Sequence, residues 1–308
     1  MMEVNMLSVC IMARLSLFRS SWDDLVKKFK FLIQYPAVPG VMLGDMKTKP
    51  VLAVIFFLLA GMIQAAELQL REWSVNGVKR EALVWIPDQI PSNGCPVIFV
   101  FHGHGGNMRS ASRGFNFHGL WPQAAVVYMQ GLPTPGKLTD PEGKLNGWNS
   151  EPDEPDNRDL IFFDAVYASL AGQIDPNRVY STGHSNGGGF TYCLWAARSD
   201  LLAAVAPSAA VASRSARGLT PKPALHVAGT ADQLVTYEWQ ERMMQTVRKL
   251  NGCAEAGELW DESGELTGTL YPSASGAPFV SLTYPGGHSL PKEVPAVIVR
   301  FFKECVRK

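Results

Sequence analysis

The sequence predicts an α/β fold with a mostly parallel central sheet and helices on both of its faces. Two strand-like segments, 67–75 and 79–86, flank Asn76-Gly77, which is a strong signal for an antiparallel hairpin. The segment 97–101 is a continuous apolar run, as is typical of a strand buried on both faces. Strand-like and helix-like segments then alternate along the chain, and this alternation favours a parallel sheet covered by helices.

The remaining elements follow in chain order. Strands are expected over 125–129, 178–181, 203–206, 224–228 and 279–283, and helices over 159–171, 187–197, 237–250 and 294–305. In parallel sheets, ligands bind in the loops beyond the carboxyl ends of the strands, so candidate site residues are sought there. The segment 131–157 is a long loop rich in Pro, Gly, Asn and acidic residues, and such loops often form lids or binding rims.

Composition indicates a globular protein with one large domain. Hydrophobic residues make up 46% of the 308 residues and charged residues 18%, so the chain can bury a full central sheet. Lysine plus arginine and aspartate plus glutamate both number 28, which gives a formal net charge of zero. This balance argues against nucleic acid as a partner and against a polybasic membrane surface. Nothing in the composition predicts an oligomeric state.

Residues 46–66 have the layout of a secretory signal peptide. Two lysines follow Met46, an apolar run covers 51–63, and the small residues Ala65 and Ala66 suit cleavage. The apolar run is short for a transmembrane helix, so no stable membrane anchor is expected. A membrane anchor or a buried helix is the alternative interpretation of this segment.

Export also determines the expected domain limits and the state of the cysteines. A signal peptide begins at the initiating methionine, so we expect residues 1–45 to be an upstream extension from a misassigned start. The mature catalytic domain is then 67–308, secreted or periplasmic. Its four cysteines are an even number, which favours disulfides in an oxidising compartment. Cys253 and Cys305 are the first candidates for a bridge, whereas Cys193 suits a plain core thiol.

Gly183 to Gly187 read G-x-S-x-G around Ser185. The expected strand 178–181 precedes this motif, and three consecutive glycines beginning at Gly187 open the following helix. A nucleophile elbow requires this strand–turn–helix setting, because glycines allow the sharp turn that lifts the serine hydroxyl into the site. We therefore expect Ser185 to be a nucleophile. The alternative is a glycine-rich helix start that only packs tightly.

His288 is the candidate base. A serine hydroxyl is a poor nucleophile until a base takes its proton. In the hydrolase order of Ser, acid and His, the base lies beyond the acid. Two histidines follow Ser185, and of these His226 lies inside the expected strand 224–228, whereas His288 lies beyond every candidate acid. His288 stands in a loop after the expected strand 279–283, and a surface-loop histidine is the alternative interpretation.

Asp232 is the candidate acid, because it directly follows the expected strand 224–228. Its role would be to hold the imidazole of the base and to stabilise the imidazolium. Asp200 and Asp261 are rivals, but neither follows an expected buried strand. The alternative role of Asp232 is an Asx turn that caps the next helix.

The run from His102 to Gly106 (His-Gly-His-Gly-Gly) follows an expected strand and resembles a loop that supplies an oxyanion amide. The candidate amides are those of Gly103, His104 and Asn186, the last being the residue after the nucleophile. Two histidines two positions apart on a loop, with no further ligands, do not predict a metal site.

Together these motifs resemble the polyhydroxybutyrate depolymerase / feruloyl esterase group of the α/β-hydrolase superfamily. The matching residues are 102–106, 175–180, 183–188, 229–232 and 286–288, with Trp148 and the pair Arg158-Asp159. The resemblance implies an α/β-hydrolase fold, hydrolysis of carboxylic esters outside the cytoplasm, and no cofactor. Ser289-Leu290-Pro291 departs from the group, in which an aromatic residue is expected before the proline. This departure concerns the substrate pocket and not the triad.

Trp148 is the candidate substrate-binding residue. It stands in the loop 131–157, and loops rarely expose a large apolar side chain without reason. The loop follows the expected strand 125–129, so it emerges at the edge of the sheet where the three candidate catalytic residues converge. We expect Trp148 to line the pocket and to contact an aryl or polymer group. The alternative is that Trp148 anchors the loop to the core.

The resulting hypothesis is an exported serine esterase that works through an acyl-enzyme. The substrates implied by the resemblance are feruloyl or other aryl esters of polysaccharide, or short hydroxyalkanoate polyesters. An exported serine peptidase is the alternative among enzymes, since the same triad serves peptidases. A non-catalytic binding protein on a hydrolase scaffold is the other alternative, and an intact Ser, Asp and His in the required order speaks against it.

Overall fold

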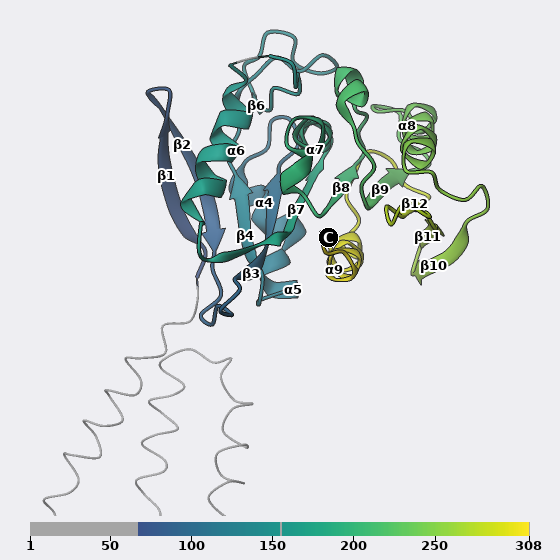
Figure 1. Cartoon of the computed structure of the whole chain (residues 1–308). Coiled ribbons are helices and arrows are strands. Elements are labelled where there is room, and N and C mark those ends of the chain that lie inside the picture. The colour runs from purple at the N-terminus through teal and green to yellow at the C-terminus, as the bar shows by residue number, and fades with distance from the viewer. Residues whose placement is uncertain (1–66, 155, 308) are drawn as a thin grey trace, which may run out of the picture. The chain divides into compact units, whose positions relative to one another are not determined.

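The computed structural model describes residues 67–154 and 156–307. The expected upstream extension (1–45) and signal peptide (46–66) lie outside the described residues. The described chain forms a ten-stranded sheet with helices on both faces, together with a two-stranded ribbon made by β5 (Leu132–Pro133) and β6 (Asn146–Gly147) (Figure 1). In this described part, no helix combines the length and the apolar character needed to cross a membrane.

The middle of the sheet is parallel and both of its edges are antiparallel. The parallel strands of the described chain are, in spatial order, β4 (Ala125–Met129), β3 (Cys95–Phe101), β7 (Ile174–His184), β8 (Ala204–Ser208), β9 (Ala224–Gly229) and β12 (Phe279–Tyr284). The antiparallel strands are β2 (Val78–Trp85) and β1 (Gln69–Val75) beyond β4, and β11 (Leu266–Tyr271) and β10 (Glu258–Ser263) beyond β12. The predicted fold class, a mostly parallel sheet with an N-terminal antiparallel hairpin, is confirmed.

Two buried apolar clusters lie on opposite faces of the sheet, because side chains alternate along each strand. In β3, Val97, Phe99 and Phe101 belong to one cluster, whereas Ile98 and Val100 belong to the other. Since both faces are covered, β3 consists of consecutive apolar residues. The helices of the first face are α6 (Arg158–Ser169), α7 (Asn186–Ala197) and α8 (Tyr237–Leu250), and those of the second are α4 (Met108–Phe115), α5 (Phe117–Leu120) and α9 (Val294–Glu304) (Figure 1).

Several elements were not predicted, because their local sequences are polar. The helix α4 begins with a capping box between Asn107 and Ser110, and its apolar stripe is short, because it consists of Met108, Ala111 and Phe115 among polar residues. The strand β10 is the last strand of the sheet and carries charged residues, as edge strands commonly do. Two short 3₁₀ helices, Ser199–Leu201 and Ser213–Gly218, also lack a sequence signal. These elements form because they pair with or pack against segments that are distant in the sequence.

The expected Cys253–Cys305 disulfide is wrong. All four cysteines of the described chain are free thiols. Cys305 packs in the apolar cluster that also contains α9, whereas Cys253 packs against the cluster on the opposite face of the sheet. The sheet therefore separates the two sulfur atoms, and the spacing of cysteines in the sequence carries no information about which face each one occupies. Cys193 is a buried core thiol, as its apolar setting predicts.

Candidate active site

The turn around Ser185 has the geometry of a nucleophile elbow. The strand β7 ends at His184 and α7 begins at Asn186, and Ser185 lies between them with φ of 56° and ψ of −122°. Residues other than glycine rarely adopt a positive φ, and such conformations cluster at functional sites. A Cβ atom at Gly187 would lie 2.2 Å from the carbonyl oxygen of Phe101, so only glycine fits between the turn and β3.

His288 reaches this turn from the loop after β12. Its Nε2 lies 2.7 Å from the hydroxyl oxygen of Ser185. Tyr284, the last residue of β12, donates its hydroxyl to the carbonyl oxygen of Gly287 at 2.8 Å. The loop that carries the imidazole is therefore tied to the end of its own strand. The structure thus brings together two residues that are 103 positions apart in the chain.

Asp232 lies behind His288 in the loop after β9. Its Oδ2 is 2.8 Å from Nδ1 of His288, and its side chain is buried. The other carboxylate oxygen, Oδ1, accepts the backbone N–H groups of Leu234 and Val235 at 2.9 and 3.1 Å. These amide bonds form the Asx turn considered as an alternative role, and they hold the carboxylate while it faces the imidazole.

The hydrogen bonds determine the tautomer of His288. An ionised carboxylate only accepts hydrogen bonds, so Nδ1 of His288 carries the proton that Asp232 accepts. The lone pair of Nε2 then faces the hydroxyl of Ser185 and can accept its proton. This tautomer is the one that general-base catalysis at a serine requires.

The rival acids lie elsewhere. Asp261 is on the edge strand β10, where its Oδ1 accepts a hydrogen bond from Nη1 of Arg300 at 2.7 Å. Asp200 lies in the 3₁₀ helix Ser199–Leu201, after the end of α7. Neither carboxylate is paired with a histidine, in contrast to Asp232.

The candidate oxyanion amides surround Ser185. A Cβ atom at Gly103 would lie 3.6 Å from Cβ of Ser185, so this glycine lets the loop after β3 approach the turn closely. Asn186 is the first residue of α7, where N–H groups have no partner within the helix. Within the described chain, the N–H groups of Gly103, His104 and Asn186 donate to no protein acceptor, which leaves them free for a ligand oxygen.

The side chains of His102 and His104 have structural partners. Nε2 of His104 lies 3.1 Å from Oδ2 of Asp140, in the long loop. Nε2 of His102 accepts the N–H of Gly131 at 3.0 Å, and burial lowers the pKa of His102. Both histidines therefore order the loop 131–157 against the end of β3. Among the described residues, no group of three His, Cys, Asp or Glu side chains could hold a metal ion.

Trp148 borders the pocket, but its indole belongs to the core. The side chain is 1% exposed, and Nε1 donates to the carbonyl oxygen of His102 at 2.9 Å. Its ring lies 5.1 Å from that of Phe101 and 5.4 Å from that of Phe190, between centroids. The expectation of a ring displayed to substrate is corrected in this respect, and the packing alternative describes the observed contacts.

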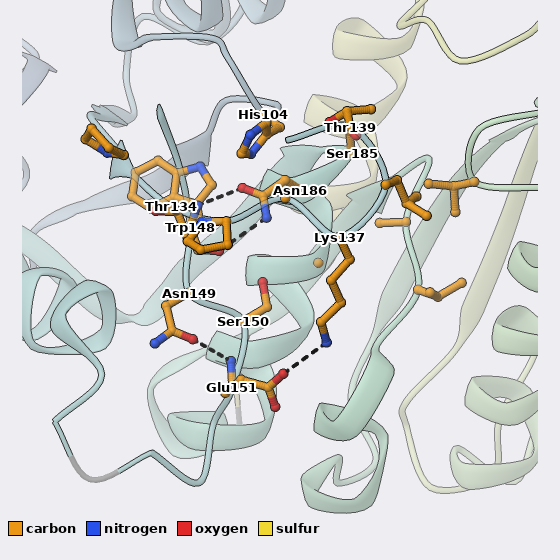
Figure 2. A pocket seen from close by; sticks show the side chains of 18 of the residues that line it. His104, Thr134, Lys137, Thr139, Trp148, Asn149, Ser150, Glu151, Ser185 and Asn186 are labelled. Atoms are coloured by element: carbon orange, nitrogen blue, oxygen red, sulfur yellow. Dashed lines mark hydrogen bonds and ion pairs between the residues drawn. The ribbon is translucent and has the colours of Figure 1, made fainter. Parts of the chain in front are cut away.

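The backbone of Trp148 is bound to the residue that follows the nucleophile. Its N–H donates to Oδ1 of Asn186 at 2.7 Å, and its carbonyl oxygen accepts Nδ2 of the same side chain at 3.2 Å (Figure 2). This reciprocal pair joins the long loop to the start of α7. The loop therefore forms a wall of the site, held in place by the core packing of the indole.

A cavity of about 670 Å³ opens over Ser185 (Figure 2). One part of its lining is apolar and comes from the segments after β8 and β9; it includes Val211, Leu234, Val235 and Trp239. Another part is polar and comes from the long loop and the start of α6; it includes Thr134, Lys137, Glu151 and Arg158. Leu234 and Trp239 are 37% and 45% exposed, although both are large apolar side chains. The cavity thus offers an apolar and a polar surface beside one nucleophile.

Two further polar residues lie near the site: His184 is partly buried, and Gln240 is fully buried and was missed in the sequence. His184 has its ring 5.0 Å from that of His288, and burial lowers its pKa to about 4, which keeps it neutral. Gln240 donates Nε2 to Oδ2 of Asp232 at 3.0 Å. A signal for Gln240 exists, because it occupies the same helical stripe as the buried Met243, Met244 and Val247.

The sheet topology and the elbow define an α/β-hydrolase of the serine type. Structural comparison agrees: an acetyl xylan esterase from Aspergillus awamori matches with a TM-score of 0.54 at 13% identity, over 76% of this chain and 99% of that one. An acylaminoacyl peptidase from Pyrococcus horikoshii also matches, with a TM-score of 0.54 at 13% identity, over 82% of this chain and 44% of that one. At these identities the likeness concerns the fold alone.

Sequence comparison identifies the family. No family model matches the chain. The chain is 29% identical over 201 residues to feruloyl esterase D of Neurospora crassa, and the aligned region covers 62% of this chain and 67% of that protein. It is 30% identical over 228 residues to a probable feruloyl esterase C of Aspergillus flavus, and the aligned region covers 70% of this chain and 79% of that protein. The chain belongs to the feruloyl esterase family and is an ester-hydrolysing serine hydrolase.

Proposed function

We propose that this protein cleaves carboxylic esters through a catalytic triad of Ser185, His288 and Asp232. The observation that carries the proposal is the unbroken line of contacts from the elbow hydroxyl to Nε2 at 2.7 Å, and from Nδ1 to the carboxylate at 2.8 Å. This line ends in a cavity large enough for an ester substrate. The tautomer of His288 is the one that lets it act as base.

The reaction would proceed in two acyl transfers. Oγ of Ser185 attacks the ester carbonyl while Nε2 of His288 takes the hydroxyl proton, and the carbonyl oxygen becomes an oxyanion. The free N–H groups of Gly103, His104 and Asn186 would bind this oxyanion, and loss of one such donor typically costs about 10²–10³ in kcat. His288 then returns the proton to the leaving alcohol. Water, activated by the same imidazole, releases the acid and regenerates the serine.

The proposed substrates are feruloyl or related aryl esters. The apolar lining formed by Val211, Leu234 and Trp239 suits an aromatic ring, because it removes flat apolar surface from water. The polar lining from the long loop suits the hydroxyl groups of a sugar. Short hydroxyalkanoate esters and peptides are the competing substrates, and they lack the aromatic acyl group that this lining would bind.

Two variants and a substrate panel test the proposal. Ser185→Ala is expected to abolish hydrolysis of feruloyl, acetyl, hydroxybutyryl and peptide substrates while leaving the Tm near that of the wild type. Ser150→Ala is the matched control, because Ser150 also lines the cavity but contacts no base. A phosphonate that reacts with serine hydrolases should label Ser185 and not Ser150. Labelling at another serine contradicts the triad, and a preference for peptide over ester contradicts the substrate assignment.

We further propose that residues 46–66 direct export and are removed. The support is the order of basic, apolar and small residues in that segment. Expression of the full coding region, residues 1–45 included, in a host that exports the protein should yield a mature N-terminus near Glu67, read by N-terminal sequencing. An exported protein that retains residues 1–45 would contradict both the signal peptide and the start at Met46.

A further inference from the structure

A chain of buried polar side chains continues from Asp232 into the interior, away from the cavity. Nε2 of Gln240 donates to Oδ2 of Asp232 at 3.0 Å and to the carbonyl oxygen of Val235 at 2.7 Å. Oε1 of Gln240 lies 3.2 Å from Nε2 of His226, and Nδ1 of His226 lies 2.8 Å from the hydroxyl oxygen of Tyr192. Gln240, His226 and Tyr192 are all 0% exposed.

The direction of every hydrogen bond in this chain follows from its chemistry. Both amide hydrogens of Gln240 are donated, so Oε1 accepts, and Nε2 of His226 must carry the hydrogen. Nδ1 of His226 then accepts the hydroxyl hydrogen of Tyr192. Burial lowers the pKa of His226 to about 4 and raises the pKa of Tyr192, so both side chains stay neutral at physiological pH. The arrangement therefore has a single set of donors and acceptors.

The stability of the fold does not by itself explain why these buried polar side chains are present. Buried polar groups cost free energy unless they are fully paired, and apolar residues of similar size would fill the same space without that requirement. The three residues come from three different elements, α8, β9 and α7, and meet behind the carboxylate. Their common end point is Oδ2 of Asp232, the same oxygen that faces His288.

We propose that Gln240, oriented by His226 and Tyr192, is a positioning residue for the acid of the triad. The proposal rests on the proposed function of Ser185, His288 and Asp232. Apart from its bond to His288, the carboxylate would otherwise be held only by the two backbone N–H groups that bind Oδ1. The amide of Gln240 fixes Oδ2 where Nδ1 of His288 needs it and draws part of the negative charge away from that oxygen.

Gln240→Met removes these hydrogen bonds while keeping a side chain of similar length. We expect kcat on an activated ester to fall about 10- to 100-fold, the range for a lost hydrogen bond to a charged group. KM should stay within about twofold, because Gln240 does not line the cavity. The acid limb of the kcat/KM profile should move to higher pH, because the carboxylate then carries more charge toward the imidazole and favours the imidazolium.

The groups near His288 do not complicate this readout. Asp232 is its hydrogen-bond partner, and His184 stays neutral because burial lowers its pKa to about 4. Tyr284 also lies near the carboxylate, and burial raises the pKa of its hydroxyl, so it does not ionise in the acid range. A movement of the acid limb would therefore report the interaction between the imidazole and the carboxylate.

Tyr192→Phe tests the end of this hydrogen-bond network that lies farthest from Asp232, because it removes only the hydroxyl oxygen. It frees His226 to adopt either tautomer, so kcat should fall less than in Gln240→Met and the acid limb should move in the same direction. Val247→Ala is the matched control: Val247 is buried on the same helix stripe but has no polar contact with Asp232. It should lower the Tm while leaving the kcat/KM profile of the wild type.

Phosphonate labelling run in parallel separates the two proposals. Wild-type labelling at Ser185, together with normal kcat and pH profile in folded Gln240→Met and Tyr192→Phe, overturns the positioning role alone. A loss of kcat in Val247→Ala as large as in Gln240→Met, at equal loss of Tm, also overturns it. If wild-type Ser185 is not labelled, the proposed function fails, and the positioning role fails with it.

Discussion

Replacing Trp148 with alanine is expected to destabilise the domain and to reduce activity on large and small esters by similar factors. The indole is 1% exposed and packs between Phe101 and Phe190, so alanine leaves a cavity. Replacing a buried Trp by Ala typically costs about 3–5 kcal/mol. For a domain of this size, about 2–4 °C of Tm is lost per kcal/mol, so the Tm should fall by about 6–20 °C.

The effect on activity follows from the backbone contacts of Trp148. Its N–H and carbonyl groups bind the side chain of Asn186, whose own N–H is a candidate oxyanion donor. When the indole no longer anchors the loop, this pair loosens for every substrate. The loss of kcat/KM should therefore be the same for a feruloyl ester and for an acetyl ester, because both form the same oxyanion.

Trp239→Ala provides the comparison, because Trp239 lines the same cavity but is 45% exposed. It should leave the Tm within a few degrees and should reduce kcat/KM on the feruloyl ester more than on the acetyl ester. The assay is differential scanning fluorimetry together with initial rates on both esters. An unchanged Tm in Trp148→Ala, with a loss confined to the feruloyl ester, would refute the packing role and restore the indole as a substrate contact.

Three further outcomes follow. Asp159→Asn leaves the 1%-exposed side chain of Arg80 without its charged partner at 2.7 Å, so urea denaturation should show a loss of about 3–5 kcal/mol, and a loss below 1 kcal/mol would contradict it. The pKa values of His184 and His226 are lowered to about 4 by burial, so the unfolded chain takes up their protons first as the pH falls below 6.5. The free energy of unfolding should be highest above pH 6.5 and should fall toward pH 4, by up to about 3 kcal/mol per histidine. Equal free energies of unfolding at pH 7 and pH 4.5 would contradict this prediction. Thiol titration of the denatured, unreduced domain should find four free cysteines, and two would indicate a bridge.

The sequence predicted the residues whose roles depend on local backbone conformation. Glycines on both sides of Ser185, a preceding strand and a following helix specify a sharp turn whatever the rest of the chain does. Loops that follow strands of a parallel sheet must meet at one edge, so Asp232 and His288 could be expected beside Ser185 before any contact was seen. The helix 237–250 was predicted with the bounds it has in the structure, because its apolar stripe and stop signal are both local.

Only the tertiary structure decided which side chain faces which partner. Cys253 and Cys305 lie on opposite faces of the sheet. The indole of Trp148 is buried in the core beside the cavity, and Gln240 contacts Asp232 and His226. A local pattern indicates that a residue is buried. Which side chain it then contacts depends on the strand order and on how the helices pack against the sheet. These depend on contacts between segments far apart in the chain, and a single sequence carries no local signal for them.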